Sequence, residues 1–114
     1  MAMTFCYNKL EICIRVIGGK WKGLILYHLH FGPKRTTELQ KLVVNITQKM
    51  LIQSLRELED DGIVKRTIYN QVPPKVEYSL TELGLSLHPI LVTLTDWGGM
   101  YQEHFQKESE MNSV

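Results

Sequence analysis

The segment Ile46–Glu59 constrains the fold most, because its apolar residues recur at helical spacing with polar residues between them. Leu51, Leu55 and Leu58 share one face of such a helix, so this face is expected to pack against a core. Thr47 stands just before the helix, where a threonine hydroxyl accepts a hydrogen bond from a free backbone amide. The opposite face is mostly polar and basic, and it carries Gln48, Lys49, Ile52, Gln53 and Arg56.

This polar and basic face has the composition of a DNA-reading surface. In a recognition helix the N-terminal residues reach base edges in the major groove, and Gln, Lys and Arg side chains suit adenine, guanine and phosphate. We therefore predict that Gln48, Lys49 and Gln53 read bases. Arg56 and Thr47 are expected to meet the DNA backbone. The alternative is an ordinary solvated helix face, which carries the same kinds of residues without a partner.

Two strand-like runs follow this helix and predict a β-hairpin. The residues Asp60–Gly62 end the helix, because glycine suits the left-handed position that follows a helix C-terminus. Val64–Tyr69 and Lys75–Leu80 are rich in β-branched and aromatic residues. The loop Asn70–Pro74 between them ends in two prolines, which lack an amide donor and cannot continue the ladder. A hairpin with a stiff tip is expected.

Three helices are predicted upstream of the DNA-reading helix. The first is short and has one apolar face, made of Leu10, Ile14 and Ile17. Lys20–Phe31 forms the second, with apolar residues available to the core at Trp21, Leu24, Ile25, Leu29 and Phe31. Pro33–Leu42 forms the third, with Thr36 or Thr37 as its N-cap. Helices followed by a hairpin are the order of a winged helix-turn-helix, a mainly α fold with a small β-hairpin wing.

Charge is divided unevenly along the chain. Residues 1–80 hold 12 Lys and Arg against 7 Asp and Glu, a net charge of +5, whereas residues 81–114 hold 1 against 5, a net charge of −4. A basic half beside an acidic half can meet phosphates with one face only. The expected DNA-backbone contacts near the helix-turn-helix and the wing are Lys34, Arg35, Thr36, Lys65, Arg66 and Lys75. Alternatives are solvated lysines that keep the domain soluble and, for Arg66, an ion pair with Asp60 or Asp61.

The acidic half carries a long apolar stripe. Its residues step by three or four along the chain, namely Leu83, Leu87, Ile90, Leu94, Trp97, Tyr101 and Phe105. Pro89 would clash with the preceding helical turn, so a kink or two successive helices is expected there, with Thr81 as a cap. The inner part of the stripe can close the core. The aromatic end lies too far along for so small a domain to bury, and we expect it to pack on a partner.

Several spaced motifs resemble the HxlR-type winged-helix transcription regulators. The motifs are Ile17–Trp21, Gly32–Arg35, Lys49–Leu51, Leu55–Glu59, Asp61–Val64, Val72–Pro74, Val76–Thr81 and Trp97-Gly98. The resemblance runs from about Leu10 to Gly98 and implies a homodimeric bacterial DNA-binding regulator related in fold to MarR-type proteins. In that family the N- and C-terminal helices make the dimer, which implies interface roles for Leu10, Ile14, Leu94, Trp97, Tyr101 and Phe105.

A redox role for the two cysteines is a further possibility. Many members of the family have a Cys-Pro pair shortly before the Gly-Gly-Lys-Trp motif, and in some the thiol is a redox switch. Aligning on that motif places Asn8 and Lys9 there, so thiol sensing at that position is unsupported. Cys6 and Cys13 fall elsewhere in the same region, and reduced structural thiols are the commoner interpretation of two cysteines in a cytoplasmic protein.

No enzyme signature is present in the sequence. It contains no phosphate-binding glycine loop, His-Glu-x-x-His motif or nucleophile elbow, and its histidines lack metal-ligand spacing, so neither an enzyme nor a cofactor or metal is expected. No apolar run reaches transmembrane length and no signal peptide is recognisable, which predicts a cytoplasmic protein without membrane contact. We expect one domain over residues 1–106 and a polar tail over residues 107–114.

The sequence therefore predicts a transcriptional regulator, in the form of a repressor, that binds double-stranded DNA at a pseudo-palindromic operator as a homodimer. Two alternatives remain. The winged helix could serve as a protein-interaction module without DNA binding, although such a surface would be richer in exposed aromatic residues than this one. A sensor of thiol oxidants or of small molecules would share the same fold, and the sequence identifies no effector.

Overall fold

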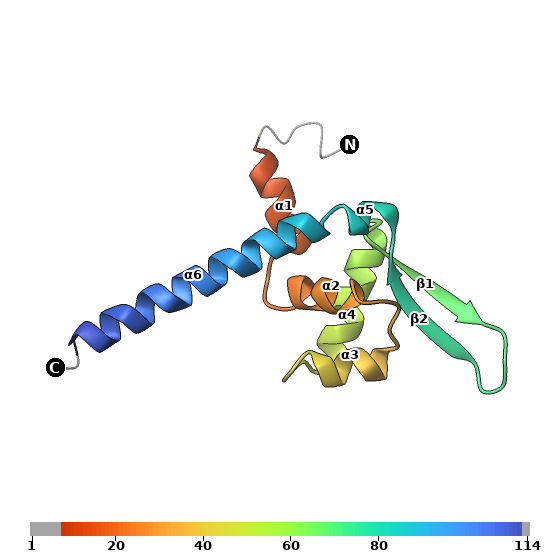
Figure 1. Cartoon of the computed structure of the whole chain (residues 1–114). Coiled ribbons are helices and arrows are strands. Elements are labelled where there is room, and N and C mark those ends of the chain that lie inside the picture. Colours follow the sequence, from red (N-terminus) through yellow and green to blue (C-terminus); the bar gives the residue numbers. More distant parts are fainter. Residues whose placement is uncertain (1–7, 113–114) are drawn as a thin grey trace.

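The computed structural model describes residues 8–112, which form six helices and one hairpin. In chain order the elements are α1 (Lys9–Ile17), α2 (Lys22–Leu29), α3 (Thr36–Leu42), α4 (Gln48–Asp60), β1 (Val64–Tyr69), β2 (Lys75–Leu80), α5 (Glu82–Leu85) and α6 (His88–Asn112). The hairpin and α6 project from opposite sides of the body, which gives the molecule extents of 62 × 39 × 24 Å (Figure 1). This arrangement is a winged helix-turn-helix, as the sequence predicts.

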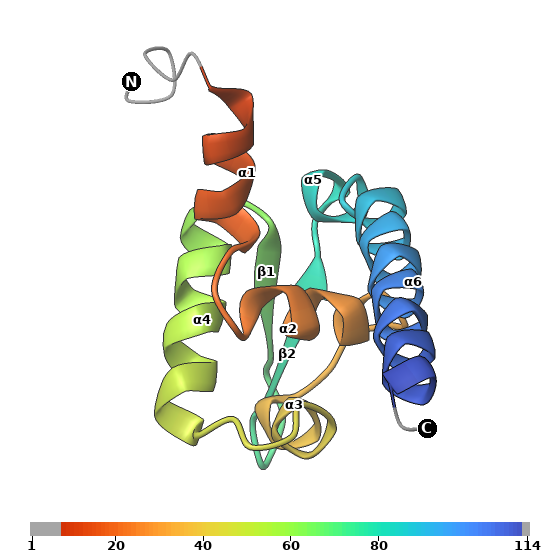
Figure 2. The same ribbon diagram turned by 90° about the vertical axis from the view of Figure 1, so that its left-hand side faces the viewer.

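The core forms where α2, α3 and α4 pack together, and α2 lies between α4 and α6 (Figure 2). Leu51, Leu55 and Leu58 of α4 are all fully buried, so the apolar face predicted from their spacing is confirmed. Burying a leucine side chain stabilises a fold by about 1.5 to 3 kcal/mol. The core is completed from the neighbouring elements by Ile25, Leu26, Leu29, Leu39, Val43, Ile46, Ile63, Val64 and Tyr78.

The prediction that Leu24 and Phe31 are available to the core is wrong. The side chain of Leu24 is 47% exposed and that of Phe31 is 66% exposed. Helix α2 is shorter than the predicted segment Lys20–Phe31 and ends at Leu29, so Phe31 falls in the turn beyond it. Leu24 lies on the side of α2 that faces away from Ile25 and Leu29, which fill the core.

The starts of the two helix-turn-helix helices are fixed in different ways. Thr47 caps α4 as predicted, since its hydroxyl accepts a hydrogen bond of 3.1 Å from the Met50 backbone amide. The prediction of Thr36 or Thr37 as the cap of α3 was wrong, because α3 begins at Thr36 and its N-cap is Arg35. The Glu38 carboxylate accepts a 3.0 Å hydrogen bond from the Arg35 backbone amide, so a side chain inside the helix secures its start.

The wing pairs β1 with β2 in antiparallel register from Val64 opposite Leu80 to Tyr69 opposite Lys75, with the bounds that the sequence predicts. Lys34 adds a short bridge to the outer side of β2. Its backbone amide donates to the Tyr78 carbonyl at 2.9 Å and its carbonyl accepts from the Tyr78 amide at 2.8 Å. This bridge ties the segment before α3 to the wing and therefore fixes the helix-turn-helix relative to the hairpin.

The chain after the wing forms two successive helices, as predicted from Pro89. The Thr81 hydroxyl caps α5 by accepting from the Gly84 amide at 3.1 Å, and Pro89 lies in the first turn of α6, where its missing amide costs nothing. The imidazole ring of His88 stacks on that of His30 with centroids 3.3 Å apart, which joins the start of α6 to the end of α2. No helix within residues 8–112 is long and apolar enough to span a membrane.

Candidate nucleic-acid interface

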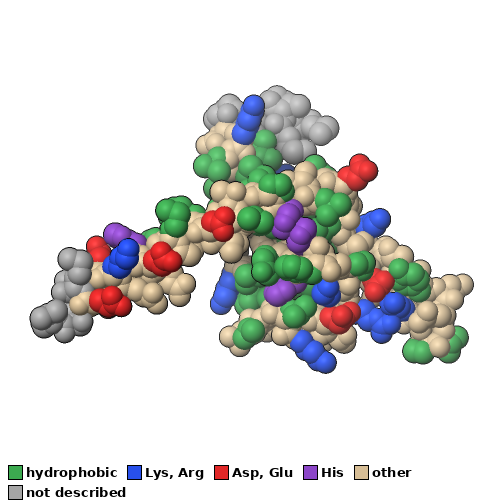
Figure 3. Space-filling model, in the orientation of Figure 1, with side chains coloured by type: hydrophobic (Ala, Val, Ile, Leu, Met, Phe, Trp, Pro, Cys, Tyr) green, Lys and Arg blue, Asp and Glu red, His purple; other side chains and the backbone are tan. Residues whose placement is uncertain are grey.

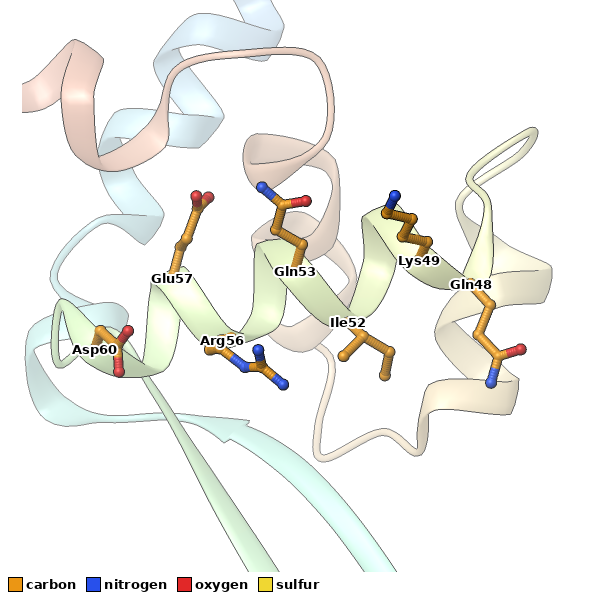
Figure 4. A pocket seen from close by; sticks show the side chains of 7 residues that line it. All are labelled: Gln48, Lys49, Ile52, Gln53, Arg56, Glu57 and Asp60. Carbon is orange, nitrogen blue, oxygen red and sulfur yellow. The ribbon is translucent and has the colours of Figure 1, made fainter.

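The side chains on the outer face of α4 point away from the core of the protein. Seven of them line a shallow hollow along the helix, namely Gln48, Lys49, Ile52, Gln53, Arg56, Glu57 and Asp60 (Figure 4). They form two lines at a spacing of four residues, one through Lys49, Gln53 and Glu57 and the other through the remaining four. The predicted base-reading residues Gln48, Lys49 and Gln53 are all exposed, so the structure brings them together on one accessible surface.

Charge on this face is partly neutralised toward the C-terminal end of α4. The Lys22 ammonium lies 3.0 Å from the Glu57 carboxylate, and its hydrogen bond and charge hold the pKa of that carboxyl below its ordinary value. Lys49 and Arg56 form no ion pair with any carboxylate among residues 8–112. The N-terminal half of the face therefore keeps a positive charge that is available to an anionic partner.

The basic residues of the wing differ in how far they are engaged. Lys65 and Arg66 are exposed on β1, and the Arg66 guanidinium lies 4.0 Å from the Glu59 carboxylate. An acidic group at the end of α4 does approach Arg66, although it is Glu59, in place of the Asp60 or Asp61 considered from the sequence. Lys75 is half-buried, 3.5 Å from Glu77 and 5.0 Å above the Tyr69 ring, so it is the most constrained of the three.

The predicted DNA-backbone contacts before and at the start of α3 differ in how accessible their side chains are. Arg35 is exposed, and Thr36 is half-buried in the first turn of α3. The Lys34 ammonium donates to the Gly32 carbonyl at 3.2 Å, which folds this side chain back along its own loop. Burial, aided by the charge of Lys34, lowers the pKa of His28 below its ordinary value. Arg35 is therefore the most accessible cation at this point of the chain.

The six residues assigned to the dimer interface all lie on the surface. Their exposed fractions are at least one half, namely Leu10 64%, Ile14 59%, Leu94 52%, Trp97 59%, Tyr101 51% and Phe105 54%. The aromatic rings on α6 form a continuous column, with centroids 5.3 Å apart between Trp97 and Tyr101 and 5.0 Å apart between Tyr101 and Phe105. Acidic side chains predominate along α6, where Lys107 is the one Lys or Arg residue, whereas most Lys and Arg groups lie over the body and the wing together with some acidic ones (Figure 3).

The structure describes one of the two cysteines. Cys13 lies on α1 as a free and exposed thiol, and Cys6 lies outside the described residues. Within the described part of the chain no group of three or more His, Cys, Asp or Glu residues is arranged to hold a metal ion.

A helix-turn-helix with an exposed polar and basic reading face, followed by a hairpin wing, defines a DNA-binding protein of the winged-helix class. The chain belongs to the family of HxlR-like helix-turn-helix proteins, whose model matches residues 16–106.

Similar proteins agree with this membership. The chain is 64% identical to the uncharacterized HTH-type transcriptional regulator YkvN of Bacillus subtilis, over 91% of this chain and 88% of that protein. It is 38% identical to the HTH-type transcriptional regulator YodB of the same organism, over 90% and 91% of the two chains. The structure of the redox regulator HypR in its reduced form superposes with a TM-score of 0.83, with 49% identity over 88% of this chain and 99% of that one. The protein is thus an HTH-type transcriptional regulator and not an enzyme.

Proposed function

We propose that the protein is a repressor that binds a pseudo-palindromic operator as a homodimer, with α4 lying in the major groove of each half-site. The exposed face of α4 carries this proposal, because it presents Gln48, Lys49 and Gln53 together beside an unpaired Arg56. Glutamine pairs with adenine and lysine with guanine through hydrogen bonds that distinguish the base pairs in the major groove. Thr47 and Arg56 then meet the phosphates that border the reading helix.

The phosphate contacts are assigned to Arg35 and Thr36 at the start of α3 and to Lys65 and Arg66 on the wing. These positions flank α4 in the fold, so they can hold the helix in register without reading sequence. Lys34 and Lys75 take part after release from their present partners, the Gly32 carbonyl and the Glu77 carboxylate. The dimer forms through α1 and α6, because a monomer leaves the aromatic column of α6 in water.

Replacement of Gln53 tests the base-reading assignment. Gln53→Ala should relax base preference at one position of each half-site, because a bidentate base contact supplies about 1 to 3 kcal/mol of discrimination. The measurement is the affinity for every single-base substitution of the operator, compared between wild type and variant. Gln106→Ala, which removes an exposed glutamine from α6, is the matched control and should leave the profile unchanged. A wild-type profile in Gln53→Ala would show that Gln53 reads no base.

The wing is tested by the dependence of binding on salt. The double variant Lys65→Ala/Arg66→Ala should bind every DNA sequence more weakly, and the slope of log affinity against log salt should fall by about 1 for each phosphate that is no longer neutralised. The pairing of Arg66 with Glu59 makes Lys65 the larger contributor. Lys107→Ala on α6 removes one positive charge far from the wing and should keep the wild-type slope. An unchanged slope in the double variant would remove the wing from the interface.

A thiol response is a second candidate function, favoured by the exposed thiol of Cys13 and by the similarity to a protein described as a redox regulator. Operator affinity measured with and without the thiol oxidant diamide, in wild type and in Cys13→Ser, tests it. A response through this thiol predicts that oxidant weakens binding of the wild type and leaves Cys13→Ser unaffected. Equal responses of the two proteins would exclude Cys13 as the sensor.

A further inference from the structure

A cavity of about 360 Å³ lies between α1, the C-terminal end of α4 and the junction of α5 and α6. Its volume falls within the range of about 300 to 1,000 Å³ that is usual for small-molecule sites. Aliphatic side chains make most of its wall, namely Ile12, Val16, Ile17, Ile63, Leu83 and Leu87. The cavity is open on one side, and it therefore offers the apolar part of a small molecule partial shielding from water.

The charged residues of the cavity wall carry a net negative charge. Asp60, Asp61 and Arg15 line it, so two carboxylates face one guanidinium. The Arg15 guanidinium lies 3.5 Å from the Asp61 carboxylate, and more than half of the Arg15 side chain is exposed, so this ion pair is weak and solvent-screened. A second positive charge fits here, whereas an anion would meet both carboxylates.

The end of α4 strengthens this preference for a cation. Glu57, Glu59, Asp60 and Asp61 crowd its last turn and C-cap, and no basic residue lies in that turn, although the helix dipole favours positive charge at a C-terminus. Three of these carboxylates have basic partners elsewhere, through the pairs Lys22–Glu57, Arg66–Glu59 and Arg15–Asp61. Asp60 has no ion-pair partner among residues 8–112. The carboxylate left without a cation thus lies where the cavity meets the hollow along α4, since Asp60 lines both.

We propose that this cavity is a binding site for a small hydrophobic cation, with an aryl or aliphatic body among the side chains of α1, α5 and α6 and a charged amine at Asp60 and Asp61. The side chains Leu10 and Ile14, which the proposed dimer uses, do not line the cavity, whereas Ile17 on the same face of α1 does. A ligand seated there contacts the helix that carries the reading face. Any effect on operator binding rests on the proposed function, but the binding site itself does not.

Titration calorimetry on the full chain without DNA tests the site with three probes that share one body. These probes are 4-phenylbutylamine, the neutral 4-phenylbutan-1-ol and the anionic 4-phenylbutyrate. The amine should bind with one molecule per chain and about tenfold more tightly than the alcohol, with the carboxylate weakest. Equal affinity for amine and alcohol, or no binding of the amine, would overturn the proposal.

Three variants locate the site. Asp60→Asn should weaken binding of the amine about tenfold and leave binding of the alcohol unchanged. Glu11→Gln removes an exposed carboxylate from α1 outside the cavity and should change neither. Ser86→Trp places a large ring in the cavity from an exposed position and should abolish binding of the amine while the circular dichroism spectrum stays that of the wild type. Unchanged amine affinity in Ser86→Trp, or the same affinity in Asp60→Asn and Glu11→Gln, would contradict the assignment.

Discussion

Trp97→Ala should dissociate the proposed homodimer into monomers at micromolar concentration. Trp97 is 59% exposed in the single chain and stacks on Tyr101, so its ring contributes little to the fold of one protomer and much to a surface that a partner can cover. Loss of a large buried ring costs about 3 to 5 kcal/mol. Because a homodimer carries the substitution in both protomers, the dimer dissociation constant should rise by at least about a hundredfold.

Sedimentation velocity of wild type and variant, together with operator affinity, measures this effect. Operator binding should weaken as the dimer dissociates, because a monomer engages only one half-site. Val92→Ala is the matched control, since Val92 is an exposed apolar residue on the opposite side of α6 by helical spacing, and it should leave the dimer intact. A wild-type protein that sediments as a monomer at this concentration would contradict the assignment of the α6 stripe.

Gly84→Ala should destabilise the fold by about 3 kcal/mol, at the upper end of the usual cost of overpacking. A Cβ atom at Gly84 would lie 2.2 Å from the Ile63 carbonyl oxygen, which is backbone and cannot move aside as a side chain does. The same Ile63 carbonyl accepts a hydrogen bond of 3.0 Å from the Thr81 backbone amide. Displacing this carbonyl therefore also disturbs the link between the wing and α5. The site thus requires glycine for close approach of two backbones.

Gly23→Ala is the control for this substitution and should have the opposite sign. No atom lies within 4 Å of a Cβ built at Gly23, and the residue is inside α2, where alanine is favoured over glycine by about 0.5 to 1 kcal/mol. Urea unfolding of both variants at one fixed protein concentration gives the two free energies, since unfolding of a dimer depends on concentration. Equal stability of Gly84→Ala and wild type would show that α5 can shift away from the wing without cost.

Much of the fold could be predicted from the sequence because its signals are local. Thr47 sits three residues before the amide that it caps, the strand bounds follow from residue type and flanking turns, and Pro89 separates α5 from α6 by its own geometry. The helical spacing of Leu51 and Leu55 also fixes which side chains of α4 point outward. This spacing alone therefore identifies the residues on the outer face of α4, whereas their contacts with DNA stay a prediction.

The features missed from the sequence depend on contacts between residues far apart in the chain. The bridge of Lys34 to Tyr78 and the ion pair of Lys22 with Glu57 join segments that only the tertiary fold brings together. Leu24 is suited to the core by its residue type, but α2 meets its neighbours on the other side. The start of α3 was misjudged because Glu38 can cap from within the helix, which makes a threonine at the N-cap unnecessary.

Selection of binding sites from random duplex DNA by the wild-type protein tests the central claim most directly, with the selection repeated for the variant Gln48→Ala/Lys49→Ala/Gln53→Ala. The wild type should select two inverted half-sites whose centres lie about 10 base pairs, or a multiple of that, apart. The variant should still bind DNA through its phosphate contacts but select no common sequence. A wild type that selects no sequence, or a variant that selects the same half-sites as the wild type, would contradict the reading of DNA by α4.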